Sequence, residues 1–248
     1  MDIAAFLKPP EIMSARRALC IQPHPDDNEI GMGGIVAALS ANGCEVNYLT
    51  VTNGDLGDQT GAIDPGELAV LRREETIAAG KAIGVKGFYF MDKPDGSLGD
   101  IPALAGEIAA LIRTIRPDVL FCPDPWALYE AHQDHVVTGR AAAQAFISSA
   151  LARYPRGTDT DPWQCAAIGF YFTQAPNTVV DVTDTFEAKF AAMALHRSQL
   201  NEELLEMYRT YFTMRGQMLA QGRGFALGEG LKVLGPLHLH CFAEAPQI

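Results

Sequence analysis

Short apolar runs alternate with helical segments through the first 150 residues, and this alternation constrains the fold more than any other feature. Strand-length apolar runs that end in turn-forming residues lie at 18–22, 45–52, 88–91 and 119–122. Segments with helical spacing lie between and after them, near 30–39 and at 68–83, 101–115 and 136–151. Because helices of this length connect parallel strands, the order predicts an α/β, Rossmann-like fold with a mainly parallel sheet covered by helices on both faces.

The pattern changes after Arg153. Residues 166–172 and 178–182 read as strands that extend the sheet, and residues 186–207 read as one helix. The glycine-rich stretch 221–230 is predicted to be mobile or to form an interface. Since no linker or repeat interrupts the chain, we expect a single domain over residues 1–248.

The charge balance bears on the kind of partner. The formal net charge is -11, and the 19 lysine and arginine residues are scattered along the chain. Binding of a nucleic-acid backbone needs clustered cations that displace counterions, so no nucleic acid is expected. A small neutral molecule is the better match.

Cysteine usage and hydropathy indicate the compartment. The five cysteines are far apart and form no CxxC pair, which favours neither a disulfide scaffold nor a cysteine zinc site. The N-terminal segment lacks a basic start followed by a long apolar stretch, and no run approaches about 18 apolar residues. We therefore expect a cytoplasmic protein with no membrane segment.

Two polar clusters follow the first and fourth expected strands. The first is PHPDDNE at 23–29 and the second is EAHQDH at 130–135, and together they hold three of the six histidines. In a sheet of this kind ligands bind outside the carboxyl ends of the strands, so the two clusters should converge there.

The residue types in these clusters suit a divalent metal. Imidazole and carboxylate are common zinc ligands, and catalytic zinc typically keeps three protein ligands and one open position. His24, Asp27 and His135 provide such a set, which places the metal site at the C-terminal ends of the strands. Asp26 and His132 would remain beside the metal as an anion and a proton carrier, the parts that metal-assisted amide hydrolysis requires.

The strings PHPDDNEIGMGG and HQDH together resemble the paired signature of the LmbE-like (PIG-L) deacetylases. Weaker segments fall in the same order along the chain, including TNGDLG, KPDGSL and HRSQL. The resemblance implies a metal-dependent N-deacetylase that acts on a small N-acetylglucosamine-type sugar, with Zn²⁺ as the metal and Fe²⁺ or another divalent ion as alternatives. It also implies a homo-oligomer.

Residue roles carried over from the resemblance follow its motifs. It implies metal ligation by His24, Asp27 and His135, and Asp26 as the base that activates water. It implies that His132 stabilises the tetrahedral intermediate or protonates the departing amine. Asp134 would orient one of the histidines.

Four further residues are candidates for substrate contact. The resemblance implies this role for Arg72 and Asp95, although Arg72 opens the charged turn RREE, which taken alone indicates a solvated helix face. His238 and His240 alternate on an expected strand, so their side chains would point to the same side. In related enzymes a C-terminal histidine reaches a neighbouring subunit's site, and a structural role is the alternative for this pair.

Other functions remain open at this point. One is an amidase that acts on a larger sugar-thiol conjugate or another N-acyl substrate. A second is a metal-dependent sugar-binding protein without catalysis, against which Asp26 and His132 count. A third is a nucleotide-binding domain, which the absence of a GxGxxG phosphate loop disfavours.

Overall fold

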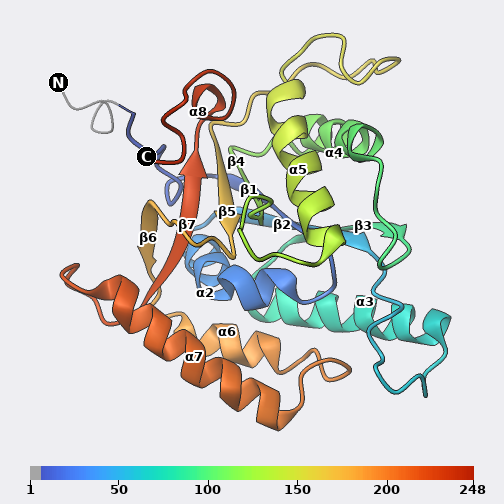
Figure 1. Cartoon of the computed structure of the whole chain (residues 1–248), viewed down its shortest axis with the longest axis vertical. Coiled ribbons are helices and arrows are strands. Elements are labelled where there is room, and N and C mark those ends of the chain that lie inside the picture. Colours follow the sequence, from blue (N-terminus) through green and yellow to red (C-terminus); the bar gives the residue numbers. More distant parts are fainter. Residues whose placement is uncertain (1–6) are drawn as a thin grey trace.

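A seven-stranded sheet forms the centre of the molecule (Figure 1), which is known from a computed structural model that describes residues 7–248. The strands are β1 (Arg17–Gln22), β2 (Glu45–Thr52), β3 (Gly87–Lys93), β4 (Val119–Pro123), β5 (Ala167–Tyr171), β6 (Thr178–Asp181) and β7 (Gly228–Leu234). The order across the sheet is β3-β2-β1-β4-β5-β7-β6.

The sheet is mixed. β1 pairs in parallel with β2 and β4, β2 with β3, and β4 with β5. β7 runs antiparallel to both β5 and β6. The prediction of an α/β fold is confirmed. The antiparallel part comes from the C-terminal region, where sequence analysis did not predict β7.

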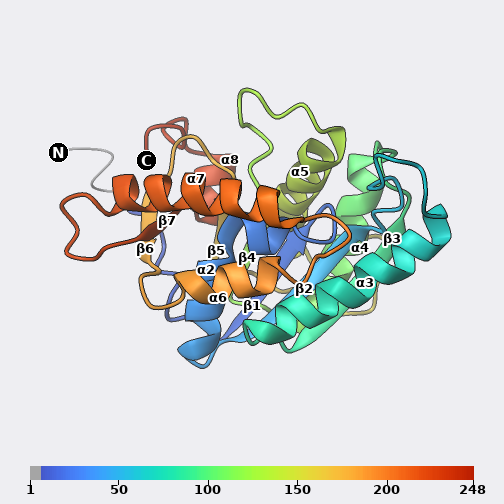
Figure 2. The same ribbon diagram turned by 90° about the horizontal axis from the view of Figure 1, so that it is seen from below.

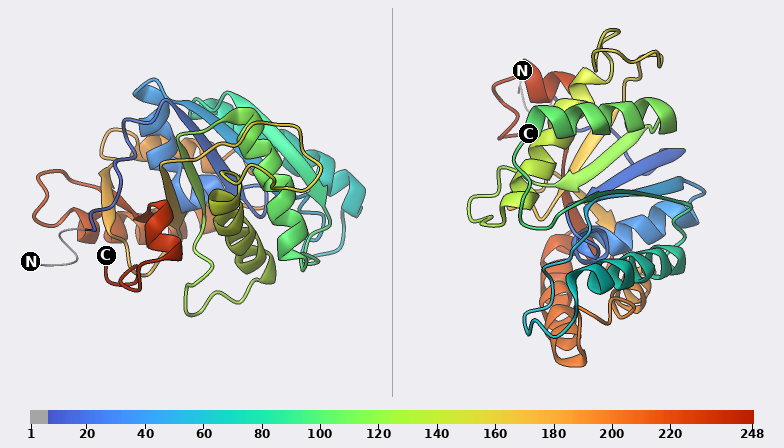
Figure 3. Two further views of the ribbon diagram at one scale, coloured as in Figure 1. Left: turned by 90° about the horizontal axis from the view of Figure 1, so that it is seen from above. Right: turned by 90° about the vertical axis from the view of Figure 1, so that its right-hand side faces the viewer.

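Helices lie on both faces of the sheet (Figures 2 and 3). They are α2 (Asp27–Ala41), α3 (Pro65–Ala82), α4 (Ile101–Ile115), α5 (Gln133–Ser148), α6 (Phe186–Met193), α7 (Glu202–Ala220) and α8 (Pro236–His240). α4 and α5 bury one apolar cluster against the sheet, including Ile108 and Phe146. α2, α3 and α6 bury the other, including Ile35 and Phe190. Burial on both faces accounts for the nearly continuous apolar sequences of β1 and β4.

The expected helix over 186–207 is wrong in one respect, because the structure has two helices there. α6 ends at Met193 and α7 begins after Asn201, whose side chain accepts a hydrogen bond from the Leu204 amide. Such a cap satisfies an otherwise free N–H and starts a new helix. The apolar spacing in the sequence therefore continues across the turn between two separate helices.

The expected strand containing His238 and His240 is also wrong. Both residues lie in the short helix α8, which follows Gly235 and has Pro236 in its first turn. Proline is compatible with a first helical turn but donates no ladder hydrogen bond. Residues two apart on a helix do not share a face, so the two imidazoles do not point to the same side.

The glycine-rich stretch 221–230 is partly ordered as sheet. Its last residues, from Gly228, begin β7, where Gly228 and Gly230 pair with β6. Elsewhere Gly84, with φ of 89°, follows the end of α3 and provides the left-handed residue expected at a helix C-terminus. No helix within residues 7–248 combines the length and apolarity that crossing a bilayer requires.

Candidate metal centre

The two polar clusters converge because β1 and β4 are adjacent parallel strands, with Cys20 opposite Phe121. His24 follows β1, and Asp27 is the first residue of α2. His135 lies in the first turn of α5, after the loop that follows β4. The ends of two neighbouring strands therefore carry all three side chains.

One atom from each of His24, Asp27 and His135 lies within 4.8 Å of the others. The carboxylate of Asp27 bridges the imidazoles, with Oδ2 3.3 Å from His24 Nδ1 and Oδ1 3.3 Å from His135 Nε2. His24 and Asp27 are buried, and His135 is nearly so. Two imidazole nitrogens and a carboxylate facing one point match the donor set of a catalytic zinc site.

The remaining ring nitrogens face further carboxylates. His24 Nε2 lies 3.2 Å from Asp95 Oδ1 and 3.4 Å from Asp134 Oδ2. His135 Nδ1 lies 3.3 Å from Glu130 Oε2. Carboxylates in these positions fix the ring orientation of metal-binding histidines. Sequence analysis did not assign Glu130 to the site, although its place in the EAHQDH cluster was a usable signal.

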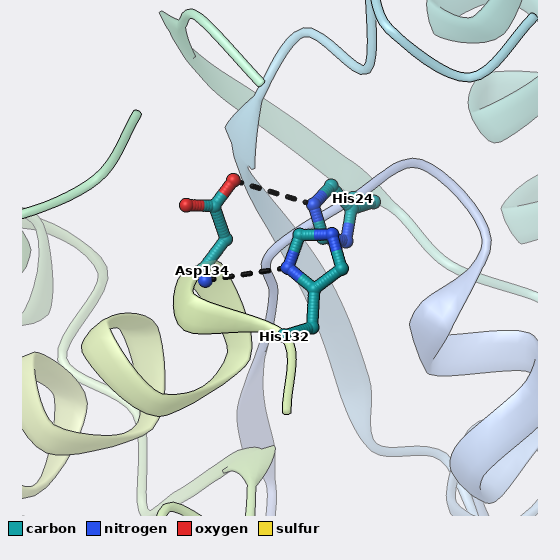
Figure 4. A group of neighbouring side chains, drawn as sticks. All are labelled: His24, His132 and Asp134. Atoms are coloured by element: carbon teal, nitrogen blue, oxygen red, sulfur yellow. Dashed lines mark hydrogen bonds and ion pairs between the residues drawn. The ribbon is translucent and has the colours of Figure 1, made fainter. Parts of the chain in front are cut away.

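Asp134 is fully buried and holds three segments together. Its carboxylate accepts hydrogen bonds from the amides of Gly96 and Leu98, at 2.7 and 3.1 Å, and approaches His24 (Figure 4). The structure also groups His24, His132 and Asp134 as a possible metal set. Because both Asp134 oxygens already accept backbone hydrogen bonds, the set built on Asp27 is the better candidate.

His132 precedes α5 and is exposed. Its Nδ1 accepts a hydrogen bond from the Asp134 amide at 3.3 Å, the second dashed line in Figure 4. A nitrogen that accepts cannot carry the proton of a neutral imidazole, so the proton is on Nε2. The ring of His132 lies edge-on to that of His24, with centroids 4.4 Å apart, and therefore offers an N–H donor beside the metal set.

Asp26 lies at the start of α2 with φ of 140°, a backbone conformation that side-chain-bearing residues rarely adopt. Arg72 donates hydrogen bonds to Asp26 Oδ2 at 3.3 Å and to the carbonyls of Pro25 and Gly54. Burial raises the pKa of Asp26 to about 6, with the Arg72 guanidinium opposing the rise.

Arg72 is only 4% exposed, so the solvated-face interpretation of the RREE turn is wrong. The guanidinium points inward because its hydrogen-bond partners are the Asp26 carboxylate and two loop carbonyls. The spacing of apolar residues along α3 carries no information about these partners. The predicted substrate contacts of Arg72 and Asp95 stay predictions.

The histidines and carboxylates of the centre shift one another's protonation. Burial alone would lower the pKa of His24, but Asp134, Asp27 and Asp95 raise it to about 12. Burial would also lower the pKa of His135, but the carboxylate of Asp27 outweighs that effect and raises it. The pKa of Asp27 is held well below its usual range by His135 and His24, against the effect of burial. The centre is thus a tightly coupled set of charges.

His238 and His240 belong to neither possible metal group. His238 Nδ1 accepts a hydrogen bond from the Gly235 amide at 3.0 Å, and His240 is exposed. Within one chain, the described residues give these histidines no contact with the centre.

His196, the first residue of the HRSQL segment, is fully buried beside the centre. Its Nε2 lies 3.3 Å from Glu29 Oε2, and Glu29 is also fully buried. Ser198, two residues on, donates to the Glu75 carboxylate through both its amide and hydroxyl. The HRSQL segment therefore fastens the turn between α6 and α7 to α2 and α3.

Fold and site together define an α/β protein with two histidines and one aspartate placed as a metal-binding set, and with a second, largely buried aspartate, Asp26, beside it. Residues 19–146 match the PIG-L family, described as GlcNAc-PI de-N-acetylase. The chain belongs to this family.

Relatives extend the similarity over most of the chain. A diacetylchitobiose deacetylase of Thermococcus kodakarensis is 34% identical over 228 residues, covering 91% of this chain and 85% of the relative. A 1D-myo-inositol 2-acetamido-2-deoxy-alpha-D-glucopyranoside deacetylase of Kineococcus radiotolerans is 27% identical, covering 82% and 76%. The solved structure of the N,N'-diacetylchitobiose deacetylase from Pyrococcus horikoshii superposes with a TM-score of 0.89 at 33% identity, covering 95% of this chain and 90% of that one.

Proposed function

We propose that this protein is a metal-dependent N-deacetylase that hydrolyses the acetamide of a small N-acetylglucosamine-type sugar to acetate and a free amine. The observation that carries the proposal is the convergence of His24, Asp27 and His135 with Asp26 and His132 at their side. The deacetylase relatives support the same reaction.

We propose zinc as the metal, held by His24, Asp27 and His135 at the C-terminal ends of β1 and β4. The donor set fits, because two imidazoles and one carboxylate leave a fourth position free in a tetrahedral site. When bound, zinc polarises the amide carbonyl and lowers the pKa of bound water. Fe²⁺ or another divalent ion can use the same ligands.

Asp26 is the proposed general base. With a pKa of about 6 it is ionised at neutral pH, yet basic enough to accept a proton from the attacking water. The water oxygen bonds to the carbonyl carbon, and the same carboxyl group returns the proton to the nitrogen as the C–N bond breaks. Arg72 holds the carboxylate in place through its hydrogen bond to Oδ2.

His132 is proposed to act as a hydrogen-bond donor to the reacting amide. Its Nε2–H would hydrogen-bond to the developing oxyanion or to the departing nitrogen. Asp134 would position His24 through its contact with Nε2, while Arg72 and Asp95 remain the proposed substrate contacts.

We further propose that residues 1–248 act as one domain in the cytoplasm and assemble as a homo-oligomer. All five cysteines are free, as in a reducing compartment. Assembly would allow His238 or His240 to serve a neighbouring chain's site, and light scattering that shows a monomer would contradict this.

The test of the proposed function compares the amounts of the two products. Protein loaded with one zinc per chain should release acetate and primary amine in equal amounts from N-acetylglucosamine or a glycoside of it, and chelation should stop the release. Release of a larger acid, with no acetate, would instead support the amidase alternative. Sugar binding without turnover would support the binding-protein alternative.

A further inference from the structure

The helix α2, whose first residue Asp27 is a proposed metal ligand, is broken in its second turn. Met32 has φ of -154° and ψ of 29°, which are not helical values, so a short first segment ends before Met32 and a second segment begins after it. A break of this kind interrupts the hydrogen bonds between successive turns. The direction of the first segment, and hence the position of Asp27, therefore needs support from outside the helix.

A buried ion pair from two other elements fills the break at Met32. Lys189 of α6 and Glu229 of β7 approach through Nζ and Oε1, which are 2.6 Å apart. Lys189 is fully buried, and Glu229 is 8% exposed. Both α6 and β7 come from the C-terminal third of the chain and lie beside α2 (Figures 1 and 2).

Each member of the pair bonds to one side of the break. Lys189 Nζ donates to the carbonyl of Ile30 in the first segment, at 2.9 Å. Glu229 Oε2 accepts from the amide of Ile35 in the second segment, at 2.8 Å. A cation is favourable at the carbonyl end of a helix and an anion at its amide end, so each side of the break faces the charge that it favours.

Two glycines of the GMGG sequence make room for the pair. A Cβ atom on Gly33 would lie 3.0 Å from Lys189 Cγ. A Cβ atom on Gly34 would lie 3.0 Å from Val182 and 3.1 Å from Glu229 Oε2. Because larger residues would collide with the pair or its surroundings, this packing gives a physical reason for glycine at both positions.

The pair is not free to bind substrate, although both side chains border a cavity of about 530 Å³ beside Asp27. Two of the three N–H groups of Lys189 Nζ are given to Ile30 and Glu229. The ring of Phe212 covers Nζ, with its centroid 3.9 Å away. Both carboxylate oxygens of Glu229 already accept a hydrogen bond. Any effect of the pair on the metal centre must therefore pass through α2.

We propose that Lys189 and Glu229 are positioning residues for the metal centre, which fix the direction of the first segment of α2 and with it the carboxylate of Asp27. The inference rests on the proposed function, because it takes Asp27 as a metal ligand. Metal ligands must be held within about 0.5 Å of their productive geometry, so a loose first segment lowers metal affinity although every ligand is still present.

The test uses the double variant K189M/E229M. Replacement of both partners leaves no buried charge unpaired, and such exchanges are often neutral or stabilising for folding. Zinc affinity, measured by chelator competition, should fall about 10- to 100-fold, as is typical when a residue that supports a metal ligand is lost. The visible absorption bands of the Co²⁺-loaded protein depend on the arrangement of the ligands, so they should change in position or intensity.

R113M is the matched control. Arg113 is also a buried cation, 2% exposed, and donates to the carbonyls of Ser149 and Thr160, but it lies on α4 at the opposite face of the sheet. R113M should lower the melting temperature and leave zinc affinity and the Co²⁺ spectrum as in the wild type. If K189M/E229M does not fold, E229Q replaces it, because an amide keeps the shape but one acceptor oxygen only, and a smaller change in the same direction is expected.

Wild-type zinc affinity with an unchanged Co²⁺ spectrum in the folded variant would overturn the inference. Equal losses of affinity in R113M would overturn it too, because they would reflect stability alone. Failure of the wild-type protein to release acetate from N-acetylglucosamine would refute the proposed function by itself, since the metal measurements still decide whether the pair positions Asp27.

Discussion

Replacement of Arg72 by methionine should move the acidic limb of the pH profile to higher pH. Arg72 is 4% exposed and its guanidinium contacts Asp26 Oδ2 at 3.3 Å, so solvent screens the pair little. Burial raises the pKa of Asp26 to about 6 even though the guanidinium of Arg72 lowers it. An opposite charge at this range lowers a carboxyl pKa by about 1 to 3 units, so its removal should raise the pKa of Asp26 by that amount.

The direction in which the acidic limb moves follows from the role of Asp26 as the base. Asp26 must be ionised to accept a proton, so kcat/KM rises with pH through its pKa and the limb moves upward in R72M. If the pKa of Asp26 rises by about 2 units, kcat/KM at pH 7 should fall about tenfold and recover at high pH. The bound cation adds its field in both proteins, so the prediction concerns the difference between them.

The assay is kcat/KM for acetate release between pH 5 and pH 10. R72K keeps the charge and loses the planar fork, so its limb should stay near that of the wild type. R73M is the matched control, because Arg73 is the next residue along α3, is about half exposed and pairs with Asp92 instead. A loss in R72M of the same size at every pH would refute the electrostatic argument and indicate displacement of the loop that Arg72 holds.

The remaining predictions concern the metal centre. D26N should reduce kcat by about 10²- to 10⁴-fold with zinc content near one per chain by metal analysis; loss of the zinc as well would make Asp26 a ligand. H135A should lose zinc and turnover together, and retention of both would contradict the ligand set. D134N should weaken zinc binding about 10- to 100-fold in chelator competition, because His24 loses a carboxylate partner, and wild-type affinity would count against that role. Zinc affinity should rise with pH, because the raised pKa values of His24, about 12, and His135 mean that binding displaces protons; pH-independent affinity between pH 6 and pH 8 would contradict this.

Sequence reasoning worked where local pattern and the general topology of α/β sheets decide the outcome. The helix at 101–115 and the strand at 45–52 have the predicted bounds, because caps and apolar runs mark their ends. The proximity of His24 and His135 followed from one rule, that adjacent parallel strands end at the same edge.

The features that sequence analysis did not predict share a different cause. Burial of Arg72, the Glu130 contact with His135 and the Glu29 contact with His196 depend on which distant segments meet, and spacing along one element carries no such information. β7 was missed because its glycines at 228 and 230 read as loop, whereas its pairing with β5 and β6 stabilises a strand. Tertiary contact overrode local propensity in each case.

The charge arrangement explains how the centre can keep its shape when a metal enters. Asp27 lies between two imidazoles, and Asp95 and Asp134 face the outer nitrogen of His24, so carboxylates would repel one another if nothing positive stood between them. Raised pKa values of His24 and His135 supply that positive charge as imidazolium before a cation arrives. A divalent cation that displaces one proton from each imidazole replaces two charges with two, which leaves the charge balance of the cluster unchanged. Because the same carboxylates are stabilised in both states, we expect the ligands to need little rearrangement when a cation binds.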